Sequence, residues 1–226
     1  MSLYNQDFYI NRHQRTKYAA ETVLSIVLET IPSVNSAVDF GCGVGTWLSV
    51  LKDNGATRIK GYDGPWVDQN LLEIDKQEFQ EVVLENEVSL DGHYDLAISL
   101  EVIEHLSKRA GERLIDYLIR SSDFVLFSAA IPFQGGVGHI NEQWQDHWVE
   151  LFSQKDYKPF DIVRKKIWHD QQIPFWYKQN ILLFVKKEQI QNIQSHVPED
   201  FTDRQTFSMV HPEQYIETIN YMQGVK

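Results

Sequence analysis

The chain has 226 residues, of which 42% are hydrophobic and 12% aromatic, enough for one domain with a single core rather than two. Its formal net charge of −11 makes nucleic acid an unfavourable substrate, because a polyanion would be repelled. No apolar run is long enough for a membrane helix, Cys42 is the only cysteine, and the N-terminal stretch lacks a secretory-signal pattern. We therefore expect a soluble, cytoplasmic protein without disulfides or a membrane partner.

Strand-like and helix-like segments alternate along most of the chain, which is typical of a mainly parallel sheet covered by helices. In chain order the pattern predicts a helix at 14–30, a strand at 36–41, a helix at 45–54, strands at 58–63, 78–84 and 94–100, a helix at 107–120, a strand at 123–130, and a helix at 141–154 with Asn141 as its N-cap. Two β-type runs follow at 157–168 and 179–187 with no helix between them, which favours an antiparallel hairpin. The expected fold is an α/β Rossmann-like doubly wound sheet of seven strands, mostly parallel with an antiparallel C-terminal hairpin, and with helices on both faces.

The expected domain covers residues 1–190 and is followed by a polar extension at 191–226. We predict an amphipathic helix at 211–222 within that extension, which would dock on the domain or lie between subunits of a homo-oligomer. At the other end, Phe8 and Tyr9 would belong either to a lid over a bound ligand or to a disordered lead-in.

A glycine-rich turn, VDFGCGVGTW at 38–47, follows the first predicted strand. Its glycines permit positive φ angles and close backbone approach, so we expect a ligand at this carboxyl edge of the sheet. A nicotinamide-binding turn would read G-x-G-x-x-G, whereas here Thr46 takes the last position and Asp39 precedes the first glycine. Asp39 suits a cationic ammonium group, and Asp63, which ends the second strand, suits the two hydroxyls of a ribose. The two acids fit a ligand with a ribose, a cationic amino-acid end and no phosphate.

With the segment EVIEHL after the fourth strand and the terminal hairpin, these features resemble the class I S-adenosylmethionine (SAM)-dependent methyltransferases over about residues 14–187. The resemblance implies SAM as cofactor, with Asp39 holding its methionine end, Asp63 its ribose and Trp66 stacking on its adenine. The implied cofactor-binding residues are Asp39, Gly41, Cys42, Gly43, Asp63, Gly64, Trp66, Leu84 and Glu101. Relatives often have an Asp after the third strand, where this chain has Val83 or Leu84 followed by Glu85 and Asn86, so the adenine contact stays open.

Each of these assignments has a purely structural alternative. Cys42 could be a small buried residue, and Trp66 could pack within its loop. Asp39 could cap the following turn, and Asp63 could be a surface acid.

The E-x-x-E-H spacing of Glu101, Glu104 and His105 would place all three side chains on one face of a helix beginning near Glu101. This spacing is similar to that of ubiquinone-pathway O-methyltransferases and small-RNA 2′-O-methyltransferases, in which the residues hold a divalent metal. That resemblance implies a Mg, Mn or Zn site formed by Glu101, Glu104, His105 and His139. Two other interpretations stay open, namely direct acid–base or substrate-orienting roles and simple capping of a helix N-terminus.

The segment GGVGHINEQWQDHW at 135–148 is predicted to form a mobile loop on the acceptor side, with polar groups suited to a hydroxylated ligand. It resembles bacterial methyltransferases with an H-x-N-E-Q-W pattern, mostly of unassigned substrate, some of them suspected of acting on saccharides. Trp144, Trp148 and Phe152 recur at helical spacing and are predicted to be a core stripe.

The expected function is SAM-dependent methyl transfer, directed to oxygen on a small acceptor such as a saccharide, with Glu101, His105 and His139 as candidate catalytic residues. Two alternatives are kept. One is a catalytically inactive cofactor-binding or regulatory module of the same fold, and the other is a nicotinamide-dependent oxidoreductase.

Overall fold

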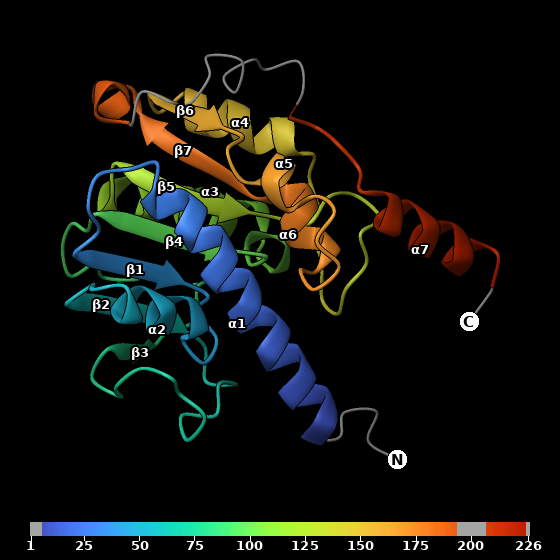
Figure 1. The fold of residues 1–226 in the computed structure, drawn as a ribbon, viewed down its shortest axis with the longest axis horizontal. Coiled ribbons are helices and arrows are strands. Elements are labelled where there is room, and N and C mark those ends of the chain that lie inside the picture. The colour runs from blue at the N-terminus through green and yellow to red at the C-terminus, as the bar shows by residue number, and fades with distance from the viewer. Residues whose placement is uncertain (1–5, 194–206, 225–226) are drawn as a thin grey trace.

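The computed structural model describes residues 6–193 and 207–224, with side chains from residue 15 onward. Seven strands form one sheet in the order β3-β2-β1-β4-β5-β7-β6 (Figure 1). Neighbouring strands from β1 to β5 are parallel, whereas β7 is antiparallel to both β5 and β6. The strands are β1 Ser36–Phe40, β2 Arg58–Asp63, β3 Phe79–Glu81, β4 Leu96–Leu100, β5 Phe124–Ser128, β6 Tyr157–Phe160 and β7 Leu182–Lys186. The predicted seven-strand, mostly parallel sheet is confirmed.

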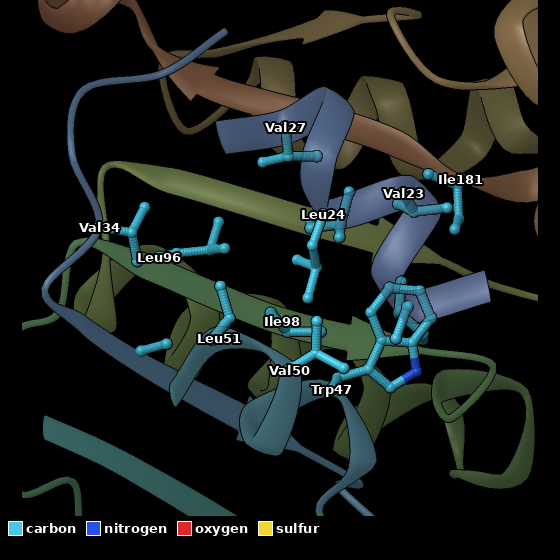
Figure 2. Close-up of a cluster of buried hydrophobic side chains, with 14 of the residues drawn as sticks. Val23, Leu24, Val27, Val34, Trp47, Val50, Leu51, Leu96, Ile98 and Ile181 are labelled. Atoms are coloured by element: carbon cyan, nitrogen blue, oxygen red, sulfur yellow. The ribbon is translucent and has the colours of Figure 1, made fainter. Parts of the chain in front are cut away.

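Helices cover both faces of this sheet (Figure 1). The α-helices are α1 Gln6–Leu28, α2 Thr46–Asp53, α3 Lys108–Ser121, α4 Gln145–Ser153, α5 Arg164–Ile167, α6 Phe175–Asn180 and α7 Pro212–Met222, and the 3₁₀ helices are η1 Ile103–His105 and η2 Lys187–Asn192. Apolar side chains of α1 and α2, including Leu24 and Leu51, meet those of β4 on one face (Figure 2). Helices α3 and α4 build the core of the opposite face.

Successive residues of the central strands alternate between the two cores. In β4, Leu96 and Ile98 join the α1/α2 core, whereas Ala97 between them joins the α3/α4 core. Since side chains alternate along a strand, a continuous apolar run is what a sheet buried on both faces requires. Each fully buried aliphatic side chain contributes roughly 1.5–3 kcal/mol to folding, so the two cores fix the carboxyl ends of the strands firmly.

Two local predictions were wrong. The helix predicted at 141–154 begins at Gln145 and not at Asn141, because the backbone N–H of Asn141 donates to the carbonyl of Glu104 in a separate loop. The run at 157–168 ends as a strand at Phe160, and α5 and α6 separate β6 from β7. Val163 and Ile167 are both buried at helical spacing, a periodicity that is hard to recognise because three consecutive basic residues separate them. The antiparallel pairing of β6 with β7 was nevertheless correct.

The predicted C-terminal helix is present as α7, and the segment leading into it is docked on the domain. Phe207, His211 and Gln214 are buried. The His211 side chain accepts from the N–H of Glu213, and Pro212 follows at the first helical position. The side chains of Phe8 and Tyr9, the predicted lid contacts, lie outside the described residues. Within the described part of the chain, no helix has the length and apolar character needed to cross a membrane.

Candidate active site

A cavity of about 790 Å³ opens at the carboxyl ends of β1 and β4. These two strands are adjacent, and the strand order reverses between them, so the cavity lies at the switch point where open α/β sheets bind ligands. The sequence-predicted residues that line it are Asp39, Gly41, Cys42, Gly43, Glu101, Glu104, His105 and His139. The glycine turn and the E-x-x-E-H segment therefore share one site, as predicted.

The glycine turn is shaped by close contacts with its neighbours. Gly41 has φ +86°, and an added Cβ would collide with both methyl groups of Val102. The N–H of Gly41 donates to the carbonyl of Tyr62 (2.7 Å), which ties the turn to the end of β2. Only glycine combines a positive φ with such a close approach of Val102 without strain. The backbone of the turn is therefore open towards the cavity.

Asp63 lies behind this turn rather than on the cavity wall. One carboxylate oxygen accepts from the N–H of Gly43 and the other from the N–H of Gly64, each at 2.6 Å. The side chain is buried, so it is neither a surface acid nor mobile. Each carboxylate oxygen retains a second lone pair that a ribose hydroxyl could use, and the ribose contact stays a prediction.

Asp39 faces the cavity from the end of β1 and is 2% exposed. Burial raises the pKa of its carboxyl well above the ordinary value, and the neighbouring Asp63 carboxylate raises the pKa further. A nearby cation would favour the charged form of a buried acid of this kind. The position suits a ligand that carries an ammonium group.

The remaining predicted cofactor residues surround the turn. The Cys42 sulfur packs where a Cβ on Gly61 would lie, and burial raises its thiol pKa, so the side chain is an inert filler. The Trp66 indole lies across Gly64 and remains 72% exposed. Leu84 is buried beyond the end of β3. Of these described residues, Gly64, Trp66 and Leu84 are outside the cavity lining, and their roles towards adenine stay predictions.

The helix predicted to begin near Glu101 is not formed. Glu101 has a φ of +56°, in the left-handed region, and the chain then makes only the short 3₁₀ helix η1. Glu101, Glu104 and His105 still line the cavity together, but they do so through this sharp turn and not through one helical face. A non-glycine residue at positive φ is held by its surroundings, a type of strain that gathers at functional sites.

Glu101 is fixed by two side-chain amides. Its carboxylate accepts from Asn180 Nδ2 (3.0 Å) and from Gln134 Nε2 (2.7 Å). Burial raises the pKa of this carboxyl, while the two amide donors act in the opposite direction. Glu101 thus presents an oriented carboxylate to the cavity, and its partners come from outside the E-x-x-E-H segment.

Glu104 is 1% exposed, and among the described residues neither of its carboxylate oxygens has a hydrogen-bond partner. Burial, together with Glu101 and Glu142 nearby, raises the pKa of the Glu104 carboxyl well above its ordinary value. An unpaired buried carboxyl is costly, and sites that retain one commonly use it for a proton or a cation.

Two imidazoles complete this group. The rings of His105 and His139 meet edge to face with centroids 4.7 Å apart. One ligand atom from each of Glu104, His105 and His139 lies within 4.8 Å of the other two. Burial and the neighbouring His139 lower the pKa of His105, which favours its neutral form. Of the four predicted metal ligands, the structure gathers these three and assigns Glu101 to the amide network instead.

The loop at 131–143 carries His139 over the cavity. Its last part is bound to η1, since the N–H groups of Ile140 and Asn141 both donate to the carbonyl of Glu104. His139 Nδ1 is 2.8 Å from Glu142 Oε1. In the helix that follows, Trp148 and Phe152 are core residues as predicted, but Trp144 is 45% exposed, so the three-residue stripe was wrong at its first member.

Comparison with known proteins identifies a domain type and a fold. Residues 11–119 match a family model described as a methyltransferase domain, and this region contains the glycine turn, β2 and the E-x-x-E-H segment. Residues 11–119 are thus a methyltransferase domain by this match, and the fold of the chain is that of the class I SAM-dependent methyltransferases. No curated protein sequence matches this methyltransferase significantly.

Solved structures resemble the methyltransferase in fold. The magnesium protoporphyrin IX methyltransferase ChlM from Synechocystis PCC 6803 with bound SAM is 16% identical, with a TM-score of 0.53 over 82% of this chain and 85% of that one. The plantazolicin methyltransferase BpumL is 14% identical, with a TM-score of 0.51 over 79% and 88%. The small RNA methyltransferase HEN1 is 15% identical, with a TM-score of 0.52, and the match covers 77% of this chain but 25% of that one.

Sequence reasoning missed the residues that hold Glu101. Gln134 lies between the predicted strand at 123–130 and the predicted loop segment at 135–148, and Asn180 lies in the β-type run predicted at 179–187. The available signal was the polar stretch KQN immediately before the apolar run ILLFV, since buried amides at the start of a central strand need specific partners. Lys178, Gln179 and Asn180 are all buried in the methyltransferase.

Proposed function

We propose that this methyltransferase transfers a methyl group from SAM to a hydroxyl of a small hydroxylated acceptor such as a saccharide. The observation that carries the proposal is the single cavity that joins the glycine turn and Asp39 at one end to Glu104, His105 and His139 at the other. Methyl transfer from a sulfonium requires the two substrates to be held in line, and such positioning can supply about 7–11 kcal/mol of the barrier reduction.

At the donor end, the turn backbone would lie along the methionine part of SAM, and Asp39 would pair with its ammonium group. Asp63 would accept the ribose hydroxyls with the lone pairs left free by Gly43 and Gly64. Trp66, with its exposed indole, would cover the adenine. Two acids beside the turn would repel a pyrophosphate, which disfavours the nicotinamide alternative.

At the acceptor end, a hydroxyl oxygen that attacks the methyl carbon must lose its proton as the sulfonium leaves as a thioether. His105 is suited to take that proton, because burial and His139 keep its imidazole neutral. The amide-held carboxylate of Glu101 would accept a hydrogen bond from an acceptor hydroxyl and orient it. The glycine-rich loop would close over the acceptor.

A divalent metal is the second arrangement that these residues fit. The orphaned Glu104 carboxylate and two imidazoles form a donor set typical of Mn or Zn, and Glu104 would gain the partner it lacks. When bound, the metal would lower the pKa of the acceptor hydroxyl. Glu104, His105 and His139 would hold it, and Glu101 would remain the orienting carboxylate.

Calorimetric titration with SAM and with NAD tests the donor. We expect SAM to bind and NAD not to bind, and the reverse pattern would overturn the proposed function. Methyl transfer is then measured against a panel of saccharides and small phenols. SAM binding without turnover on any acceptor, even after the panel is widened, would favour the inactive binding module.

Adding a chelator to the active reaction separates the two acceptor-side arrangements. Loss of activity that Mn²⁺ or Mg²⁺ restores supports the metal, whereas an unchanged rate leaves His105 as the base. The variant His105→Gln should abolish turnover in either case while leaving SAM binding intact. His93→Gln, a change at an exposed histidine outside the cavity lining, is the matched control.

A further inference from the structure

We propose that the docked C-terminal segment, residues 207–222, is a positioning element of the acceptor site that fixes the orientation of His139 and Glu101. The inference deepens the proposed function and rests on it for the roles of those two residues. Two hydrogen-bonded routes carry the argument, and each joins the segment to one of them.

The first route runs from α7 to His139 through the backbone of one residue, Phe133. Gln214 Nε2 and Thr218 Oγ1 both donate to the carbonyl of Phe133, at 2.8 and 3.1 Å. The N–H of Phe133 donates to Glu142 Oε2 at 2.8 Å, and the other oxygen of Glu142 lies 2.8 Å from His139 Nδ1. Helix α7 therefore acts on His139 through Phe133 and Glu142.

The second route runs from the start of α7 to Glu101. The N–H of His211 donates to Gln179 Oε1 (2.7 Å), and Gln179 Nε2 donates to Gln134 Oε1 (3.2 Å). Gln134 Nε2 in turn donates to Glu101 Oε2 at 2.7 Å. Each amide in this chain is oriented by its neighbours, because an amide that accepts with its oxygen must donate with its nitrogen. Undocking the segment would remove the donor to Gln179 Oε1, and Gln134 would then be held by Asn180 and by the N–H of Ile131.

The loop between the two routes has little conformational preference of its own. Gly135, Gly136 and Gly138 all have positive φ, and Phe133 has a φ of +66° although it is not a glycine. A left-handed non-glycine residue is strained and persists only where its surroundings hold it. For Phe133 the surroundings are the two donors from α7 and the Glu142 carboxylate.

The segment is anchored strongly enough to provide this support. Phe207 is 1% exposed, and its carbonyl accepts from Nη1 of the buried Arg164 at 2.7 Å. Gln145 Nε2 donates to the carbonyl of Met209, and Lys178 Nζ donates to Glu213 Oε1. The far surface of α7 is exposed, so the helix contacts the domain mainly through the groups that reach Phe133 and Gln179.

The predicted consequence is a fixed imidazole tautomer. With Glu142 accepting from Nδ1–H, the lone pair of His139 resides on Nε2. That atom lies where a Cβ on Gly136 would be, beside the cavity. Undocking of α7 should therefore allow both tautomers of His139, although α7 does not contact His139 directly.

The test is the double variant Gln214→Leu with Thr218→Val, which removes both donors to Phe133 and retains side-chain volume. Gln214 Oε1 is buried without a partner, so leucine there also removes an unsatisfied acceptor and should not prevent folding. Imidazole ¹⁵N spectra should show His139 moving from one tautomer to a mixture. Amide exchange in residues 133–143 should become about tenfold faster or more, while β5 stays unchanged.

Asn220→Leu is the matched control, because it also replaces a polar α7 residue, but one that is exposed to solvent. An unchanged His139 spectrum in the double variant, or the same change in Asn220→Leu, would overturn the proposal. The single variants Gln214→Leu and Thr218→Val should give intermediate effects, which keeps the test decisive if the double variant folds poorly. Titration with S-adenosylhomocysteine should be unaffected in all variants, so failure of donor binding stays distinguishable from failure of the coupling.

Discussion

The donor end of the cavity is held by hydrogen bonds to backbone groups near the ends of the adjacent strands β1 and β2, whereas the acceptor end is held by side chains from segments far apart in the chain. At the donor end, Asp63 binds the N–H groups of Gly43 and Gly64, and the turn is bonded to the end of β2. At the acceptor end, Glu101 depends on Gln134 and Asn180, residues 33 and 79 positions away.

The two ends also differ in how well their polar groups are satisfied. Both Asp63 oxygens have partners, whereas Glu104 is buried with none among the described residues, and Glu101 and Phe133 have positive φ. Strain and unmet hydrogen-bonding capacity thus concentrate at the acceptor end. The proposed donor site is therefore rigid, and the proposed acceptor site uses some of the stability that the two cores supply.

The largest expected effect is at the donor turn. Gly41→Ala should lower the free energy of unfolding by about 2–4 kcal/mol, because the new Cβ collides with Val102 and the residue keeps a left-handed backbone. Thermal or urea unfolding measures the change. Gly43→Ala is the control, since nothing lies within 4 Å of its added Cβ, and an equal loss there would show that backbone strain alone is responsible.

The second largest effect is expected on removal of the Asp63 carboxylate. Asp63→Ala should weaken SAM binding by about 1.5–3 kcal/mol, the scale of hydrogen bonds to a charged group, because the ribose contact and the tie to Gly43 are both lost. Calorimetry measures the affinity. Asp68→Ala, at an exposed acid in the loop after β2, should bind SAM normally. An affinity for SAM within error of the unmodified protein would remove Asp63 from the donor site.

At the acceptor end, we expect a substitution that raises the free energy of unfolding instead of lowering it. Glu104→Met should raise the free energy of unfolding by about 1–3 kcal/mol near neutral pH in the presence of a chelator, because an unpaired buried carboxyl is removed. Burial raises the pKa of Glu104 in the folded state, so folding is favoured while this carboxyl is protonated. The stability of the unmodified protein that is linked to Glu104 is therefore full below the unfolded pKa of about 4.3, and it is lost as the pH rises towards the folded pKa.

The stability gain of Glu104→Met should therefore grow with pH, by up to about 1.4 kcal/mol per pH unit. Urea unfolding at a series of pH values checks this slope. Glu87→Met, at an exposed glutamate, should show no such slope. A destabilised Glu104→Met variant would mean that the carboxyl has a partner in solution.

The smallest effect is expected at Trp66. Trp66→Leu should weaken SAM binding by about 0.5–1.5 kcal/mol through the loss of aromatic stacking, with unfolding unchanged because the indole is 72% exposed. Trp144→Leu, a partly exposed tryptophan at the acceptor end, is its counterpart and should leave SAM binding unaltered. Equal effects of the two changes would contradict the separation of the cavity into two ends.

The strands, the glycine turn and the C-terminal helix were predictable because each depends on a short stretch of sequence. The run YDLAISL is apolar throughout because both faces of β4 are covered, and the glycines of the turn are spaced for close backbone approach. The start of α4 and the two helices between β6 and β7 were not predictable in the same way. They depend on the Glu104 carbonyl and on burial of Arg164, which the local pattern does not contain.

The sequence by itself determined the alternation of strands and helices, the donor turn with its two acids, and the presence of carboxylate and imidazole groups after β4. Only the tertiary structure decided that Glu104 and not Glu101 joins the two histidines, and that the C-terminal segment is hydrogen-bonded to Phe133 in the loop that carries His139. The physical reason is the range of the forces involved. Strand periodicity and turn geometry are local, whereas the partner of a buried polar group is set by whichever distant segment the folded chain brings within hydrogen-bond distance.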